Sequence, residues 1–153
     1  MGRDTRAAVD GAVGGLIATT AMSAFMLAAH RAGALGTPPP RRVTDAVLHA
    51  TGLGRPPTRW RNALAVAGHL GFGTALGIPF ALVQRRLPAS PGPLARGPLF
   101  ASGVWFVSYQ GWAPALGIMP PAHRDRPGRP ATMLAAHWLY GATLSWYVAR
   151  RGA

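Results

Sequence analysis

The stretch Ala67-Gly-His69-Leu-Gly-Phe-Gly73-Thr-Ala-Leu-Gly77 decides the fold, because its pattern recurs as Ala135-Ala-His137-Trp-Leu-Tyr-Gly141-Ala-Thr-Leu-Ser145. Both copies lie in apolar stretches long enough to cross a bilayer. Each follows a loop that begins Leu-Gly and ends Pro-Pro, at residues 35–39 and 116–121. We therefore expect an all-α, four-helix transmembrane bundle built from two tandem helical hairpins, an internal repeat with one histidine in each half.

Composition agrees with a membrane protein of one domain. The chain has 153 residues, of which 49% are hydrophobic and only 13% are charged. A water-soluble domain of this length is normally less apolar and more charged. Since there is no cysteine, disulfides, thiolate nucleophiles and zinc–thiolate sites are excluded. Residues 1–153 are expected to form a single integral membrane domain.

The positions of the arginines explain the net charge of +12. All 16 basic residues are arginines, and none occurs in residues 8–30, 62–84, 97–123 or 130–149. Arginine that is confined to the gaps between apolar runs is typical of loops that meet water and anionic lipid headgroups. A nucleic-acid-binding domain would instead distribute its charge along helix faces. The expected partner is the bilayer with its anionic headgroups, and nucleic acid is excluded.

Four transmembrane spans are predicted, at residues 11–29, 63–83, 99–118 and 132–148, since a helix needs about 20 residues to cross the hydrocarbon core. The first run resembles a signal peptide in its flanking arginines, but it is longer than a signal's apolar core, so we expect it to be retained. An even number of spans places both termini on one side, here named side A. The first and third loops then lie on side B.

A short helix is predicted over residues 42–53 in the first loop. Val43, Val47 and Ala50 fall on one face at helical spacing, and Arg42 and Asp45 lie opposite. Two interpretations remain open, a helix lying in the membrane interface and a solvated loop helix.

Small residues recur every four positions in three of the spans. Such stripes let helix backbones approach closely, which is a principal source of packing in lipid. An alanine- and glycine-rich composition also produces these spacings by chance, so the stripes are interpreted as packing surfaces only as a hypothesis. The proposed packing residues are Gly11, Gly15, Gly73, Gly77, Gly141 and Ser145.

Polar side chains are expected in one layer near side B. At about 1.5 Å per residue, the two histidines enter their spans at nearly equal depth, and we expect them to lie within about 10 Å of each other because each begins a small-residue stripe. The predicted layer contains His69, His137, Tyr109, Gln110, Ser23 and Thr20. Three interpretations stay open: hydrogen-bonding glue between helices, a pore or binding layer, and paired ligation of metal or haem.

No catalytic constellation stands out, and neither a catalytic nor a metal-binding residue is predicted. The spans contain no carboxylate beyond Asp10 at an edge, and the serines lack a histidine–carboxylate partnership. The run His123-Arg-Asp125-Arg126 is interpreted as a solvated side B loop. No cofactor is expected, with bis-histidine haem kept as an alternative.

The order of these features resembles the YagU-like group of small bacterial inner-membrane proteins. The resemblance rests on the Pro-Pro loops, the two His-x-x-x-Gly spans and a third span that closes on Pro114-x-x-Gly117. It implies a multi-pass bacterial plasma membrane protein of unassigned activity. The expected role is a non-enzymatic helix-packing or accessory subunit, either a homo-oligomer or part of a membrane complex. A small-solute or ion pathway lined by the histidine layer is the alternative.

Overall fold

All regular secondary structure is helical in the computed structural model, which describes residues 2–87 and 92–152. The elements in chain order are α1 (Arg3–Arg31), α2 (Pro39–Ala50), α3 (Thr58–Gln84), α4 (Pro93–Trp105), the π-helix η1 (Phe106–Trp112), α5 (Ala113–Ala115), the 3₁₀-helix η2 (Ala122–Arg124) and α6 (Arg129–Arg150). The all-α prediction is confirmed.

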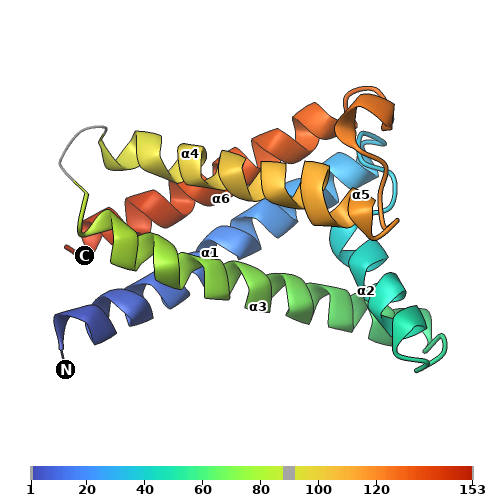
Figure 1. Ribbon diagram of the computed structural model, residues 1–153, viewed down its shortest axis with the longest axis horizontal. Coiled ribbons are helices and arrows are strands. Elements are labelled where there is room, and N and C mark those ends of the chain that lie inside the picture. Colours follow the sequence, from blue (N-terminus) through green and yellow to red (C-terminus); the bar gives the residue numbers. More distant parts are fainter. Residues whose placement is uncertain (1, 88–91, 153) are drawn as a thin grey trace.

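The long helices form two pairs that are joined side to side. Helix α1 packs extensively on α3, α4 packs on α6, and α1 also packs on α6. Helix α1 begins and α6 ends at the same end of the bundle, while α2 and α5 lie at the other end (Figure 1). Helices α3 and α4 are the outer members of this arrangement.

Proline and glycine mark where helices begin. Helices α2, α4 and α6 each carry proline in the first two helical positions, where its missing N–H costs nothing and its φ angle suits the helix. Gly128 precedes α6 with a φ of 80°, a conformation that a residue with a Cβ adopts at a cost. Pro79 lies inside α3, yet the helix continues to Gln84.

Glycines make the contact between α1 and α3. A Cβ added to Gly11 would overlap the backbone of Gly77, and one added to Gly15 would overlap the backbone of Gly73. The two helix backbones therefore touch directly, the kind of contact that small residues at four-residue spacing permit.

A second glycine crossing joins α4 to α6. A Cβ on Gly141 would overlap the carbonyl group of Gly97, and a Cβ on Gly97 would lie 2.6 Å from the Cβ of Ser145. The sequence reasoning named Gly141 and Ser145 but missed Gly97, because Gly97 has no second glycine or serine four residues away in its own helix.

The helices cover the predicted spans, with different ends. Helix α1 begins at Arg3, well before residue 11, and the third helical path runs from Pro93 to Ala115, so residues 116–118 lie in a turn. In the described part of the chain, two helices, α1 and α3, are long and apolar enough to cross a membrane by length and composition. The third helical path consists of α4, η1 and α5, and the π-helix divides it into elements that are each shorter than a span. The polar aromatic residues of α6 lower the mean hydropathy of that helix.

The loop helix α2 spans Pro39–Ala50, three residues ahead of its prediction, since Pro39 is a favourable first residue. It packs on α3. The expected apolar face is partly wrong: Val47 is 53% exposed, and Leu48 is the buried residue.

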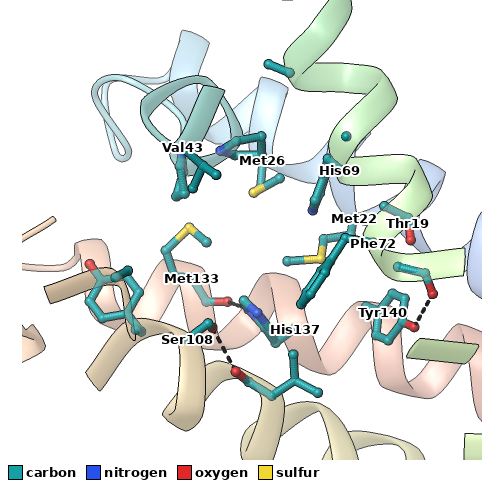
Figure 2. A pocket seen from close by; sticks show the side chains of 18 of the residues that line it. Thr19, Met22, Met26, Val43, His69, Phe72, Ser108, Met133, His137 and Tyr140 are labelled. Atoms are coloured by element: carbon teal, nitrogen blue, oxygen red, sulfur yellow. Dashed lines mark hydrogen bonds between the residues drawn. The ribbon is translucent and has the colours of Figure 1, made fainter. Parts of the chain in front are cut away.

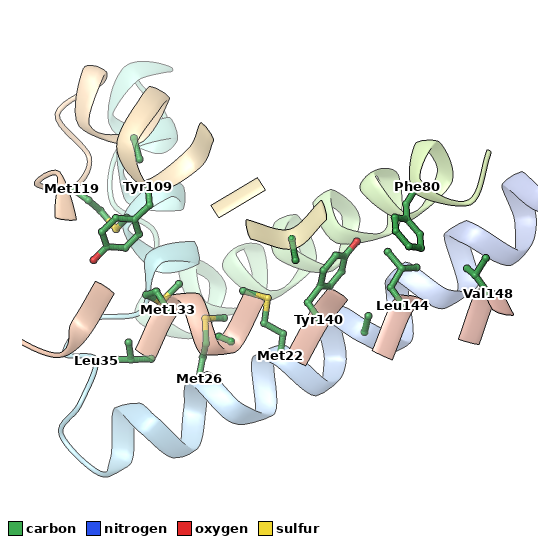
Figure 3. Packing of buried hydrophobic residues seen from close by; sticks show 14 of the residues in the cluster. Met22, Met26, Leu35, Phe80, Tyr109, Met119, Met133, Tyr140, Leu144 and Val148 are labelled. Atoms are coloured by element: carbon green, nitrogen blue, oxygen red, sulfur yellow. The ribbon is translucent and has the colours of Figure 1, made fainter. Parts of the chain in front are cut away.

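The apolar core lies between the two helix pairs. Figure 3 shows Met22 of α1 beside Tyr140 of α6 and Met26 near Met133, with Leu144 and Phe80 farther along the bundle. Four methionines of this core, Met22, Met26, Met119 and Met133, also line the candidate site, where their flexible side chains fit irregular space.

Candidate functional site

A chamber of about 330 Å³ lies near the side B end of the bundle, and both histidines line it. Figure 2 shows His69 of α3 and His137 of α6 directed into the same space, with Phe72 beside them. The wall comes from α1, α2, α3, α4, η1, α5, α6 and the loop before η2. Its residues are Thr19, Met22, Met26, Pro39, Pro40, Val43, Thr44, Ala65, Gly68, His69, Phe72, Gly73, Leu76, Val104, Ser108, Tyr109, Trp112, Ala113, Met119, Met133, His137 and Tyr140.

Hydrogen bonds at Nδ1 orient both imidazoles. The Nδ1 atom of His69 lies 3.0 Å from Ser23 Oγ on α1. The Nδ1 atom of His137 lies 2.8 Å from the carbonyl oxygen of Met133. Because a carbonyl only accepts, His137 donates its proton from Nδ1, which leaves Nε2 with a lone pair for a ligand.

Two further hydrogen bonds lie at the chamber wall, one between helices and one within α1. The hydroxyl of Tyr140 donates to the carbonyl oxygen of Gly73 at 2.8 Å and so joins α6 to α3. Thr19 donates to the carbonyl of Gly15, one turn earlier in α1, at 2.6 Å. A Cβ on Gly73 would overlap the Thr19 hydroxyl. The packing stripe and the chamber wall thus share residues.

The structure brings some residues of the predicted polar layer together and leaves others apart. His69, His137 and Tyr109 line the chamber, and Ser23 holds His69. Thr20 does not belong to it: this residue is exposed and donates to Leu16 within α1. Residues at nearly equal depth in a helix can point in different directions, because consecutive residues lie about 100° apart around the helix axis. Thr19, the neighbour of Thr20, lines the chamber instead.

Gln110 also lies outside the chamber wall. Its side-chain oxygen accepts a hydrogen bond from the backbone N–H of Ala122 at 3.0 Å, so it supports the side B loop. Gln110 belongs to the π-helix η1, whose wider turns change which residues face inward. Ser108, Tyr109 and Trp112 of the same π-helix line the chamber.

The side B loop is held by a buried ion pair, so its interpretation as a solvated loop is wrong for Asp125. The side chains of Asp125 and Arg129 are 2% and 1% exposed and lie 3.5 Å apart. Arg129 also donates to the carbonyl of Thr37 at 3.0 Å, and Tyr109 donates to Asp125. These contacts join the first loop, η1 and α6 over the chamber.

The charge of Asp125 is stabilised by its surroundings. Burial alone would raise the pKa of this carboxyl. The Tyr109 hydroxyl and the N–H of Arg126 donate to it, and the charges of Arg129 and Arg42 are nearby. These interactions keep the pKa of Asp125 below its ordinary value, so the ion pair is charged at neutral pH.

The described residues of the chamber wall offer hydrogen-bonding groups, and none of them carries a charged side chain. Its polar groups are two imidazoles, two tyrosine hydroxyls, the hydroxyls of threonine and serine, and the indole of Trp112. In the described ranges, no group of three or more His, Cys, Asp or Glu residues is arranged to hold a metal ion. The arrangement suits a mostly apolar molecule with one or two hydrogen-bonding atoms.

Sequence reasoning missed several wall residues that spacing could have found. Met133 lies four residues before His137 and Tyr140 three after it, which places all three on one helix face. Met22 and Met26 follow Thr19 with the same spacing. The contribution of α2 depends on how the first loop folds back, which no local pattern encodes.

A family model covers almost the whole chain. Residues 5–152 match the model described as a family of unknown function, DUF6789. The match does not carry the YagU-like name. The chain has no match among curated proteins or among solved structures. On the extent of the match, the chain belongs to the family of unknown function DUF6789.

Proposed function

We propose that this protein is a four-span protein of the bacterial plasma membrane that binds a small, largely apolar molecule in the histidine chamber, without covalent chemistry. The observation that carries the proposal is the placement of His69 and His137 in the wall of one chamber. Ionisable groups at membrane depth are costly, and a binding role accounts for two of them at one place.

Exposure of the apolar helices supports insertion into a bilayer. Only 33% of the most apolar window of α1 and 22% of that of α3 are buried inside the protein. In water these faces would be large exposed apolar patches, which soluble monomers rarely carry. In hydrocarbon they are ordinary lipid-facing surface.

The other two helical paths are long enough to serve as spans. Residues 93–115 are helical without a break and extend for about 34 Å at the helical rise, and α6 reaches about 33 Å. The hydrocarbon core is about 30 Å thick. The arginines of α6 lie only at its ends, at Arg129 and Arg150.

The two helix pairs are consistent with an internal repeat. Helices α1 and α3 cross at Gly11 and Gly77, and α4 and α6 cross at Gly97 and Gly141. In each pair the later helix also carries the chamber histidine. We propose on this basis that the chain consists of two related hairpins.

The alternative roles find less support. A continuous solute pathway would have to pass buried apolar side chains of the core beyond the chamber, Phe80, Leu144 and Val148. Haem would find two imidazoles, but its propionates would find no arginine in the chamber wall. An accessory role within a homo-oligomer or larger complex is compatible with ligand binding.

Insertion is tested with single cysteines, which the cysteine-free chain makes unambiguous. Cysteines at Thr51 and Gly128 on side B, and at Arg86 on side A, are labelled with an impermeant thiol reagent in oriented membrane vesicles. We expect the first two to react from one face and the third from the other. Labelling of all three from one face would refute four spans.

Ligand binding is tested with a matched glycine pair on α3. A Cβ at either Gly68 or Gly71 meets nothing within 4 Å, but only Gly68 lines the chamber. Small molecules are extracted from protein purified in mild detergent and identified by mass spectrometry, alongside an absorption spectrum for haem. We expect Gly71→Leu to retain the molecule found in the wild type and Gly68→Leu to lose it. A wild type that carries nothing, or equal retention by both variants, would refute chamber binding.

A further inference from the structure

An apolar groove of about 710 Å³ runs between α3 and α4. These two helices are not an extensively packed pair in the described residues. The rings of Phe80 on α3 and Phe100 on α4 meet at a centroid distance of 5.1 Å, and both residues line the groove. The groove is lined by Phe72, Leu76, Pro79, Phe80, Val83, Gln84, Leu87, Arg96, Leu99, Phe100, Gly103, Val104, Val107, Ser108 and Trp112.

The groove is continuous with the histidine chamber. Five residues line both spaces: Phe72, Leu76, Val104, Ser108 and Trp112. The far end of the groove lies where α3 ends and α4 begins, on side A (Figure 1). A molecule in the groove would thus extend from the side A surface toward the chamber.

We propose that the groove binds one acyl chain of an anionic phospholipid from the side A leaflet, with the headgroup held at the arginine-containing mouth. The proposal rests on the proposed insertion of α3 and α4 in the bilayer. It does not depend on what the chamber binds.

Charge at the mouth favours an anionic headgroup. Arg96 lines the groove there, and the side chain of Arg86, two residues after Gln84, is exposed and makes no hydrogen bond or ion pair within the described residues. No acidic side chain of the described ranges lines the groove. Guanidinium groups bind phosphate through paired hydrogen bonds.

A buried amide at the mouth adds a second requirement. Gln84 is 6% exposed, and its Oε1 atom has no hydrogen-bond partner among the described residues. A buried acceptor without a donor is costly. A headgroup with a hydroxyl next to its phosphate supplies both a donor for Gln84 and an anion for the arginines. Phosphatidylglycerol has this chemistry.

The groove is long enough for the part of an acyl chain that lies in one leaflet. Its lining runs from Arg96 to Trp112 on the third helical path, about 24 Å at the helical rise, and from Phe72 on α3 to Leu87 just beyond its end, about 22 Å. Half of the hydrocarbon core is about 15 Å. An acyl chain anchored at the mouth therefore reaches the residues that the groove shares with the chamber.

A matched glycine pair on the third helical path tests the site. A Cβ at Gly103 or at Gly111 meets nothing within 4 Å, and both residues are exposed, but only Gly103 lines the groove. The full chain in detergent is titrated with phosphatidylglycerol or phosphatidylcholine, and bound lipid is counted by native mass spectrometry. We expect the wild type and Gly111→Phe to bind phosphatidylglycerol at least tenfold more tightly than phosphatidylcholine.

We expect Gly103→Phe to lose this binding at least tenfold. Gly103→Ala adds only one methyl group and keeps most of it, which separates filling of the groove from misfolding. Arg86→Gln should reduce the preference for phosphatidylglycerol, whereas Arg3→Gln, at the distant start of α1, should not. Equal wild-type affinity for both lipids, or Gly103→Phe binding like Gly111→Phe, overturns the proposal. Gly68→Leu should bind lipid normally, so failure of the chamber proposal is distinguishable.

Discussion

Replacing Gly77 with alanine should separate α1 from α3 and lower the free energy of unfolding. The new Cβ would overlap the carbonyl oxygen of Gly11 and lie 3.0 Å from both the Gly11 carbonyl carbon and the Gly15 Cα, whereas ordinary contact begins at 3.4 Å. These neighbours are backbone atoms, so no side chain can move aside. Overpacking of this kind costs about 1–3 kcal/mol.

The matched control is Gly71→Ala in the same helix. A Cβ at Gly71 meets nothing within 4 Å, so only the higher helix propensity of alanine remains, which stabilises by about 0.5–1 kcal/mol. The same gain offsets part of the clash in Gly77→Ala. The two variants should therefore change stability in opposite directions and differ by about 2 kcal/mol, roughly 30-fold in the unfolding equilibrium.

Unfolding in mixed micelles with increasing sodium dodecyl sulfate, followed by circular dichroism, measures this difference. The free energy of unfolding should fall by less when Gly77 is replaced by alanine in a Gly11→Ala background, because the first substitution has already separated the two helices. If Gly77→Ala is as stable as Gly71→Ala, the close crossing of α1 and α3 is refuted.

Three further predictions concern the polar contacts. Tyr140→Phe removes the only hydroxyl joining α6 to the α3 backbone among the described hydrogen bonds, and should cost about 0.5–1.5 kcal/mol in the same unfolding assay; no loss would mean that water or lipid replaces the bond. Asp125→Asn leaves Arg129 buried without its counter-charge and should cost on the order of 3–5 kcal/mol at neutral pH. Because folding lowers the pKa of Asp125 from its ordinary 3.8, its contribution should be complete above that value and disappear as the pH falls through the lower folded value; a variant with the wild-type acid profile would contradict this. Ser23→Ala removes the partner of His69 Nδ1 and should alter the imidazole ¹⁵N shifts of that histidine alone, so unchanged shifts would exclude the contact.

Local pattern was sufficient for the helices and for most of the glycines at their crossings. Apolar length predicts a helix wherever about 20 residues lack charge, and the four-residue spacing of Gly11 and Gly15 is a property of one helix face. Equal depth of His69 and His137 also follows from helical rise alone. These features depend on neighbours in sequence, so the sequence by itself determined them.

The walls of the chamber and of the groove depended on tertiary structure. Depth in a span does not specify which face of the helix a residue occupies, so the prediction placed Thr20 in the polar layer, whereas Thr19 lines the chamber. Gln110 lies in the π-helix and supports the side B loop instead. Gly97 meets Gly141 only because α4 and α6 pair. The buried pair of Asp125 and the α6 arginine forms because three segments, distant in sequence, close over one end of the bundle. Such contacts are set by how helices pack together, and no single segment encodes them.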